Sequence, residues 1–276
     1  MLLGFGRRSC DIRFGIGQRG TCLIWGLLAA LLVQLWAPAA ARGEGACPGE
    51  SDHFAGGNGS EACPYLIANP DHLNNVRNEL GAHYRLIDDI DLAGTPYVNW
   101  GPIGSEGNPF TGKLDGGGHK ISNLTIDRPD QDYVGLFGVT GSGAVIRNLG
   151  LENVNVTGHD YVGGLVGSSS GTITDSYAKG SVTANSSAGG LVGNNAGTIM
   201  SSYATGTVMT DDRYAGGLVG TNSGTIERSF AAALLQEITM LADWWEQVPR
   251  RMRNPSSRIP TLPGHSIAMA VGLSAR

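Results

Sequence analysis

The sequence carries little charge. Asp, Glu, Lys and Arg make up 16% of its 276 residues, against roughly 25% in an average globular domain. It has no strict Gly-X-Y period, which excludes a collagen triple helix. Glycine nevertheless accounts for 43 residues, more than twice the average share of about 7%. Hydrophobic residues reach 41%, enough for a folded core, so a fully disordered chain is also excluded. The glycines therefore need an explanation within a folded domain.

The N-terminal stretch differs from the rest in being basic and then apolar. Residues 1–20 contain four Arg and one Asp, an apolar run follows from Cys22 to Trp36, and small residues end at Ala41. This order predicts a secretory signal peptide over residues 1–41, cleaved near Ala41. An uncleaved membrane anchor is the alternative, because the apolar run nearly reaches spanning length.

Cysteine is scarce, and no two cysteines have the C-x-x-C spacing of a redox site. Beyond residue 41 only Cys47 and Cys63 remain. An even pair in an exported chain is most simply a disulfide, and we expect one between these two residues. A metal site is a poor alternative, because no second Cys or His pair has ligand spacing.

Beyond the signal segment the chain is acidic. Residues 42–276 contain 15 basic and 23 acidic residues, a net charge of −8, and residues 43–230 contain 9 and 20, a net charge of −11. Such a surface should repel nucleic acid and anionic membranes. We therefore expect no nucleic-acid partner and no membrane insertion after signal cleavage.

An internal repeat organises the middle of the chain. Gly-Gly-Leu-Val-Gly occurs at 163–167, 189–193 and 216–220, and Gly-Thr-Ile follows each copy. One isoleucine column repeats with steps of 25 to 27 residues, at Ile121, Ile146, Ile173, Ile199 and Ile226. A fixed period in this range predicts a solenoid. Short β-branched runs broken by Gly, Asn and Ser disfavour helices. The predicted fold is all-β, a parallel β-helix of about 26-residue coils with three short strands each.

Alternation along the repeat predicts which side chains face inward. Ser176 and Ala178 share a face opposite Tyr177, and the same pattern surrounds Tyr203 and Phe230. Bulky residues occupy the equivalent inward positions upstream, at Leu124, Ile126, Leu149 and Leu151. We therefore expect a core that narrows toward the C-terminus and an outward ladder of the three aromatic residues. The opposite choice, with the aromatic residues inside, is the alternative.

Both ends of a β-helix need covers, because open β-edges invite aggregation. Asn69, Pro70 and Gly81 have the order that begins and ends a helix, which predicts a helix through Leu80 over the N-terminal end. Apolar residues at steps of 4, 3, 4 and 3 predict an amphipathic C-terminal helix and cap; they are Leu234, Ile238, Leu241, Trp245 and Val248. The abrupt change after Ala231 also permits a frameshifted or truncated gene.

The predicted organisation has four parts. They are a signal peptide at 1–41, a Cys-containing segment at 42–69, a capped β-helix at 70–231, and a C-terminal helix with a disordered tail at 232–276.

The repeated motifs resemble the GLUG repeat of bacterial surface and secreted proteins. The upstream stretch also resembles segments that accompany that repeat, at Phe54–Gly57, Tyr65–Ile67, Asp89–Leu92, Pro102–Gly104 and Phe110–His119. The resemblance covers about 54–231 and implies a right-handed β-helix, export, and a role in surface display or adhesion. Similar repeats accompany IgA-cleaving metallopeptidases, which need His-Glu-x-x-His. None of the six histidines is followed by Glu, so the peptidase activity is not expected, and the family offers no catalytic residues to carry over.

Candidate chemical sites are few. Asp88, Asp89 and Asp91 could bind calcium, although alternation separates Asp88 from the other two, and solvated carboxylates are the simpler interpretation. Asp115 and His119 could form an acid–base pair, but the glycines between them more simply make a tight corner. The paired glycines lack the Lys and helix of a phosphate loop. We expect a steric role for the repeat glycines Gly163, Gly164, Gly167, Gly189, Gly190, Gly193, Gly216, Gly217 and Gly220.

Two functional classes remain. The first is a non-enzymatic β-helix, secreted or at the cell surface, that binds an extracellular glycan or a surface protein and needs no cofactor. The second is a polysaccharide lyase or hydrolase, which rests on fold analogy alone. An enzyme of that class should gather carboxylates with Arg or Lys in one groove. Asp175 instead stands in line with Ser201 and Arg228 of the next two coils. The sequence therefore favours binding over catalysis.

Overall fold

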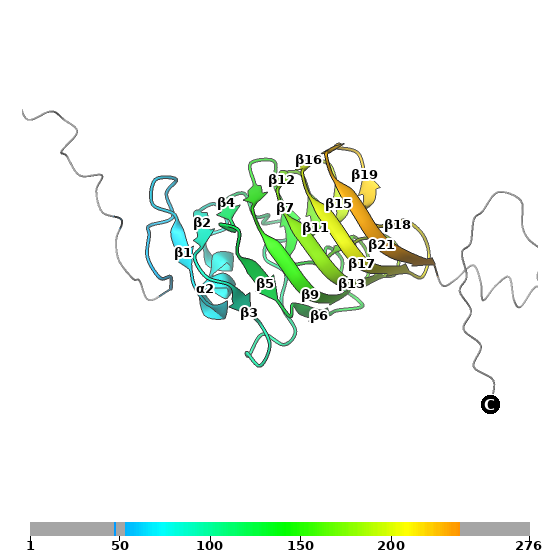
Figure 1. The fold of residues 1–276 in the computed structure, drawn as a ribbon, viewed down its shortest axis with the longest axis horizontal. Helices are drawn as coiled ribbons and strands as arrows, with labels where there is room; N and C mark the ends of the chain where they lie inside the picture. The colour runs from blue at the N-terminus through cyan, green and yellow to red at the C-terminus, as the bar shows by residue number, and fades with distance from the viewer. Residues whose placement is uncertain (1–46, 48–52, 238–276) are drawn as a thin grey trace, which may run out of the picture. The chain divides into compact units, whose positions relative to one another are not determined.

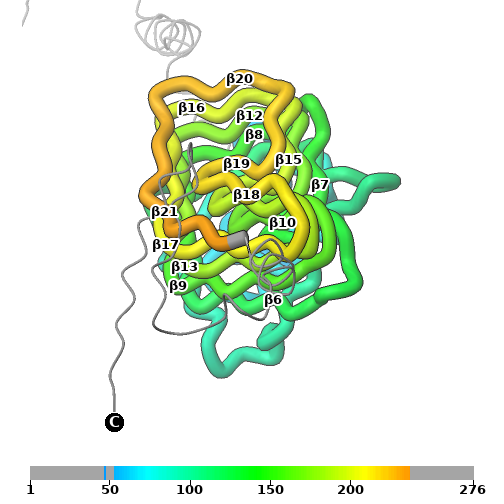
Figure 2. Tube along the Cα trace, turned by 90° about the vertical axis from the view of Figure 1, so that its right-hand side faces the viewer, coloured from blue at the N-terminus to red at the C-terminus, as the bar shows by residue number. Residues whose placement is uncertain are grey.

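The computed structural model describes Cys47 and residues 53–237, and the predicted signal peptide lies outside this part of the chain. The described residues form a parallel β-helix of about six turns, with coils of about 27 residues, as predicted. Figure 1 shows the strands stacked side by side along the long axis. Each coil in Figure 2 turns anticlockwise as the chain advances toward the viewer, so the β-helix is right-handed.

Four parallel sheets run along the solenoid. Sheet A contains β1 (Tyr65–Ile67), β2 (His83–Leu86), β4 (Lys113–Asp115), β8 (Val145–Arg147), β12 (Thr172–Thr174), β16 (Thr198–Met200) and β20 (Thr225–Glu227). Sheet B contains β3 (Ile90–Asp91), β5 (Lys120–Ser122), β9 (Gly150–Thr157), β13 (Tyr177–Ala184), β17 (Tyr203–Thr210) and β21 (Phe230–Glu237), with β6 (Thr125–Asp127) also paired to β9.

The other two sheets belong to the repeat region. Sheet C contains β7 (Phe137–Thr140), β11 (Val166–Ser169), β15 (Val192–Asn195) and β19 (Val219–Asn222). Sheet D contains the two-residue strands β10 (Val162–Gly163), β14 (Ala188–Gly189) and β18 (Ala215–Gly216). A repeat coil therefore has four strands, not the three predicted, because the Gly-Gly block forms a short strand of its own.

The predicted inward face of the repeat coils is confirmed. Ser176 and Ala178 are buried, and Leu151, Ala178 and Ala204 lie in one register across β9, β13 and β17. On the opposite face Tyr177 stacks on Tyr203 with ring centroids 4.9 Å apart, and Tyr203 stacks on Phe230 at 5.1 Å. The aromatic residues thus form the outward ladder, and the core narrows along this column.

The register upstream differs from the prediction. Leu114, not Ile121, pairs with Ile146 in sheet A, whereas Ile121 pairs with Leu151 in sheet B. Ile126 in turn pairs with Val156, so the predicted alignment of Leu124 and Ile126 with later coils is wrong, although both are buried. The glycine corner at 116–118 makes the path from sheet A to sheet B longer in this coil than in the repeats, which shifts the frame.

Buried serine hydroxyls hydrogen-bond to backbone groups at the corners of the repeat coils. The Ser176 hydroxyl donates to the carbonyl of Thr174 and accepts the Leu149 N–H of the preceding coil. Ser202 repeats the pattern, accepting from the Ser176 N–H at 3.2 Å. Buried polar groups are costly unless hydrogen-bonded, and here each hydroxyl is satisfied twice.

The N-terminal end is covered, and the β-helix begins earlier than residue 70. The helix α2 (Pro70–Asn75) continues into the 3-10 helix η3 (Val76–Asn78) and is shorter than predicted. The Asn69 side chain caps it by accepting the His72 N–H at 2.8 Å, and Leu73 and Val76 are fully buried. The strand β1 precedes the helix and already pairs with β2.

The C-terminal end contradicts the predicted helix over its first residues. β21 runs to Glu237, and Leu234 and Leu235 pair with Thr207 and Val208 of β17. Parallel pairing along the whole of β17 outweighs the helical spacing that begins at Leu234, and the solenoid extends beyond the predicted boundary at 231. The predicted helix and tail beyond 237 lie outside the described residues. No helix in the described part is long and apolar enough to span a membrane.

Candidate functional site

The two cysteines are joined. A disulfide links Cys47 and Cys63, with a Cα–Cα distance of 5.5 Å. It closes a loop that contains Phe54, and the Phe54 ring stacks on that of Tyr65, just beyond the loop, with ring centroids 4.3 Å apart. Tyr65 belongs to β1, the first strand of sheet A, so the disulfide-closed loop packs through Phe54 against the start of the solenoid.

The repeat glycines stand where a side chain would strike backbone. A Cβ at Gly163, Gly189 or Gly216 would lie within 2.3 Å of the carbonyl oxygen three residues later. The second glycine of each block faces the next coil: a Cβ on Gly164 would lie 2.7 Å from the Gly190 oxygen, and one on Gly190 would lie 2.4 Å from the Gly217 oxygen. The closing glycines are equally confined; a Cβ would meet backbone at 2.5, 2.4 and 2.6 Å at Gly167, Gly193 and Gly220.

The acidic cluster after β2 does not converge. Asp88 is exposed, Asp89 accepts the Lys120 N–H at 3.1 Å, and Asp91 accepts the Asn123 side-chain amide at 2.6 Å. These hydrogen bonds lower the pKa of both Asp89 and Asp91. The three carboxylates therefore do not point to one common site, as calcium binding would need.

Asp115 and His119 likewise face different partners. The Asp115 carboxylate accepts from the Gly117 N–H, from Asn148 at 3.0 Å and from Arg147 at 2.9 Å. Burial opposes its ionisation, but these donors hold its pKa below the ordinary value. The His119 ring instead lies 3.2 Å from Asp89. The intervening glycines form a corner with positive φ at Gly117 and Gly118.

Asp175, Ser201 and Arg228 stand in line, and neither Asp175 nor Arg228 forms an ion pair with another described residue. Each residue has a positive φ, and each stands at the same corner of a successive coil. Asp175 accepts from Thr174, and Arg228 reaches Ser201 at 3.5 Å. This arrangement is a ladder of corner residues, as predicted from the spacing.

Two charged clusters had no signal in the sequence. Glu152 bridges Lys120 at 2.9 Å and Lys179 at 3.3 Å, and both lysines lower its pKa. At another corner His159 Nδ1 lies 2.8 Å from Asp132, and a ligand atom of Asp160 lies close enough for the three to hold a metal ion. The ion pairs of Glu152 with Lys120 and Lys179, and that of His159 with Asp132, join residues 27 or 32 positions apart, so only the coil register brings them together.

The outer face of sheet B is built from the longest strands of the repeat region, because β9, β13, β17 and β21 have eight residues each. The aromatic ladder runs along one edge, beginning where the Tyr177 ring lies over Gly150. A polar row runs parallel to it, and the register aligns Thr125, Asn155, Ser181 and Thr207 on successive strands. Within the described residues, none of these four side chains makes a hydrogen bond to protein. The face thus offers aromatic edges and free hydroxyl and amide groups together.

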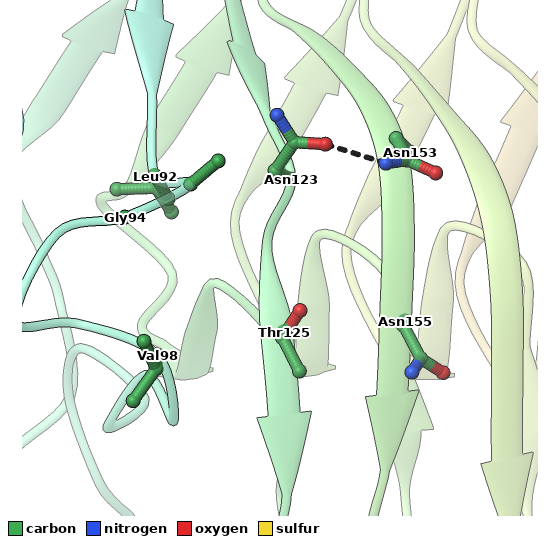
Figure 3. Close-up of a pocket in the computed structure, with 8 residues that line it drawn as sticks. Leu92, Gly94, Val98, Asn123, Thr125, Asn153 and Asn155 are labelled. Atoms are coloured by element: carbon green, nitrogen blue, oxygen red, sulfur yellow. Dashed lines mark hydrogen bonds between the residues drawn. The ribbon is translucent and has the colours of Figure 1, made fainter.

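A groove lies at the start of this row. It has a volume of about 360 Å³ and is lined by Leu92, Gly94, Val98, Asn123, Thr125, Asn153 and Asn155, among others. Figure 3 shows the amides of Asn123, Asn153 and Asn155 arranged along one side and Val98 across from Thr125. No lining residue is charged.

Comparison with known proteins identifies the class of repeat. Residues 158–183 and 184–209 match the model of the GLUG motif, so the chain contains GLUG repeats, as the sequence predicted. Both matches fall on the four-strand coils that carry the Gly-Gly blocks.

Two relatives share the repeat region. A “Putative Gly-rich membrane protein” of Evansella cellulosilytica is 43% identical over 134 residues, covering 45% of this chain and 15% of the relative. Halomucin of Haloquadratum walsbyi is 38% identical over 135 residues, covering 45% of this chain and 2% of the relative. The chain thus spans only a small part of these relatives.

One solved structure shares the fold. A crystal structure named as a “putative immunoglobulin A1 protease” from Bacteroides ovatus superimposes with a TM-score of 0.50 at 24% identity, covering 67% of this chain and 70% of that one. A likeness at this identity concerns the fold alone.

Proposed function

We propose that the protein is an exported, surface-associated β-helix that binds an extracellular polymer without cleaving it. The observation that carries the proposal is the outer face of sheet B, where a stacked aromatic ladder lies beside a row of unpartnered hydroxyl and amide groups. Aromatic rings and free hydrogen-bonding groups on a rigid surface are the chemistry of a binding face.

The separation of the charged groups supports binding over turnover. Asp89, Asp115 and Glu152 each accept hydrogen bonds from different neighbours, and those contacts lower the pKa of all three carboxylates. A general acid needs a pKa raised toward the working pH. Lowered pKa values oppose that role.

The relatives support a place at the cell surface. One is named as a membrane protein and the other as a halomucin, and the N-terminal 41 residues have the order of a signal peptide. An exported location is also consistent with the Cys47–Cys63 disulfide, since such bonds persist in oxidising compartments.

The test combines a binding assay with an assay for cleavage. The purified full chain is applied to an array of immobilised polysaccharides and extracellular proteins, and the same polysaccharides are assayed for new reducing ends. We expect binding without product. Phe230→Ser, at the exposed end of the ladder, should weaken binding, whereas Tyr214→Ser, at a comparably exposed site outside it, should not. Product release from any polymer, or the absence of binding to every probe, would overturn the proposal.

A further inference from the structure

The groove on sheet B has free polar groups held in fixed positions. Asn123 donates to Asp91 at 2.6 Å and accepts from the Asn153 amide nitrogen, so both ends of its side chain are engaged. This contact orients Asn153 and leaves its carbonyl oxygen free to accept. Asn155 is exposed, and neither end of its amide has a partner within the described residues. The groove therefore presents an acceptor and a complete amide at adjacent points of β9.

The opposite wall of the groove is apolar. Val98 is 67% exposed, which is unusual for a branched apolar side chain in a segment otherwise anchored by the buried Leu92 and Trp100. Ala93 and Gly94 complete this wall without a polar side chain. An amide-lined side facing an apolar side matches a ligand with both hydroxyl groups and C–H surfaces.

The lining of the groove favours an uncharged ligand. It contains no Lys, Arg, Asp or Glu side chain, so nothing in it would neutralise a carboxylate, sulfate or phosphate. Asp91, whose carboxylate accepts from the Asn123 amide of this lining, is held ionised by the hydrogen bonds that lower its pKa, and it would repel an anion. A neutral ligand fits this lining and an acidic one does not.

The polar row continues the groove along the solenoid axis. Thr125 and Asn155 belong to the groove, and Ser181 and Thr207 follow on the next two strands in register. Neighbouring strands lie about 4.8 Å apart, so the four side chains span about 14 Å. A row of that length suits a linear polymer better than a single small molecule.

Resting on the proposed function, we propose that this groove and row bind a neutral polysaccharide chain lying along the solenoid axis. Asn153, Asn155, Ser181 and Thr207 would hydrogen-bond its hydroxyl groups, and Val98 would contact the C–H face of a sugar ring. The inference names the ligand class and its position on sheet B, which the proposed function leaves open.

The test is calorimetric titration of the full chain with neutral hexasaccharides of glucose, xylose and mannose, with oligogalacturonate as the anionic comparison. Asn155→Ala, Thr207→Val and Val98→Asp each change one part of the predicted contact. Asn185→Ala is the matched control, because Asn185 is also an exposed asparagine without a side-chain partner in the described part of the chain but lies at the corner after β13. Melting temperatures establish that all four variants are folded.

We expect binding of at least one neutral oligosaccharide, weakened about threefold to tenfold by Asn155→Ala and by Thr207→Val, and unchanged by Asn185→Ala. Tighter binding of oligogalacturonate would overturn the ligand class. If the array shows polymer binding but the three groove and row variants bind like the parent chain, this inference fails while the proposed function stands. If no polymer binds the parent chain, both fail.

Discussion

Replacing Gly189 by alanine is a direct test of why the repeat needs glycine. Gly189 lies in β14 and has no positive φ, so its conformation is open to any residue. An added Cβ would nevertheless lie 2.0 Å from the Val192 oxygen and 2.7 Å from the Gly220 nitrogen. Both are backbone atoms. Val192 is held in β15 between strands on either side, so the clash cannot be relieved by turning a side chain.

The expected cost is that of overpacking a rigid interior, about 3 kcal/mol at the upper end of the usual range. For a domain of 150–250 residues each kcal/mol lowers the melting temperature by about 2–4 °C, which predicts a fall of about 6–12 °C. Circular dichroism melts and urea titrations measure it. Gly107→Ala is the control, because nothing lies within 4 Å of its Cβ position and its φ is not positive.

The control should change the free energy of unfolding by less than about 1 kcal/mol. Alanine lowers the conformational entropy of the unfolded chain, which favours the folded state. Because each coil contacts only its neighbours, the loss should be concentrated in adjacent coils and visible as faster amide hydrogen exchange there. If Gly189→Ala unfolds no earlier than Gly107→Ala, the steric explanation of the Gly-Gly block is wrong.

Three further outcomes follow from contacts elsewhere. Cys63→Ser opens a disulfide of 16-residue separation and should cost about 3 kcal/mol, measured as a lower melting temperature that reductant reproduces in the parent chain. Tyr203→Ala should destabilise more than Phe230→Ala, by about 1 kcal/mol, because Tyr203 stacks on both sides; equal losses in urea titrations would contradict the ladder. The hydrogen bond to Asp132 raises the pKa of His159, so its contribution to stability is present at pH values below the ordinary histidine pKa and is lost as pH rises through the raised one. An NMR titration should show that Asp132→Asn lowers the pKa of His159, and an unchanged value would exclude this cause.

Much of the repeat region could be predicted because two sets of residues repeat with the same period. They are the Gly-Gly blocks and the small side chains that face the core. The alternation of Ser176, Tyr177 and Ala178 recurs at the same place in the next coil, and the structure buries the small residues and stacks the aromatic ones. Two-residue alternation and a 26-residue period are independent signals, and their agreement fixed both the fold class and the face.

The upstream register could not be predicted from the same signals. Ile121 follows Leu114 by seven positions, whereas Leu151 follows Ile146 by five, and only the structure shows that the glycine corner at 116–118 absorbs the difference. The spacing of apolar residues does not distinguish two cases: a corner with extra residues, and an apolar residue that belongs to a different strand of the coil. The alignment based on isoleucine alone therefore assigned Ile121 to the wrong sheet.

The corners and the last strand were hidden for related reasons. Ser201 and Arg228 adopt a positive φ, which their residue types do not favour, because stacking on the Asn148 and Asp175 corners fixes their path. Leu234 has helical spacing to later residues but completes an eight-residue strand on β17. In each case packing on a neighbouring coil determines the backbone conformation, so the local sequence does not predict it.

The same dependence on neighbouring coils separates the fold from the binding face. Inward positions in register repeat a small set of residues, as at Val156, Val182 and Val208, because each must fill the space left by the coils on either side. Outside the aromatic ladder, outward positions in register differ more, as at Lys179 and Thr205 in adjacent coils. A substitution at an outward position away from the ladder costs little stability, whereas one inside disturbs two neighbours. Coils with one common core can therefore carry different outer rows without loss of the solenoid. The groove around Asn153 and Asn155 lies on that outer face, so the proposed binding site can differ between proteins that share this core.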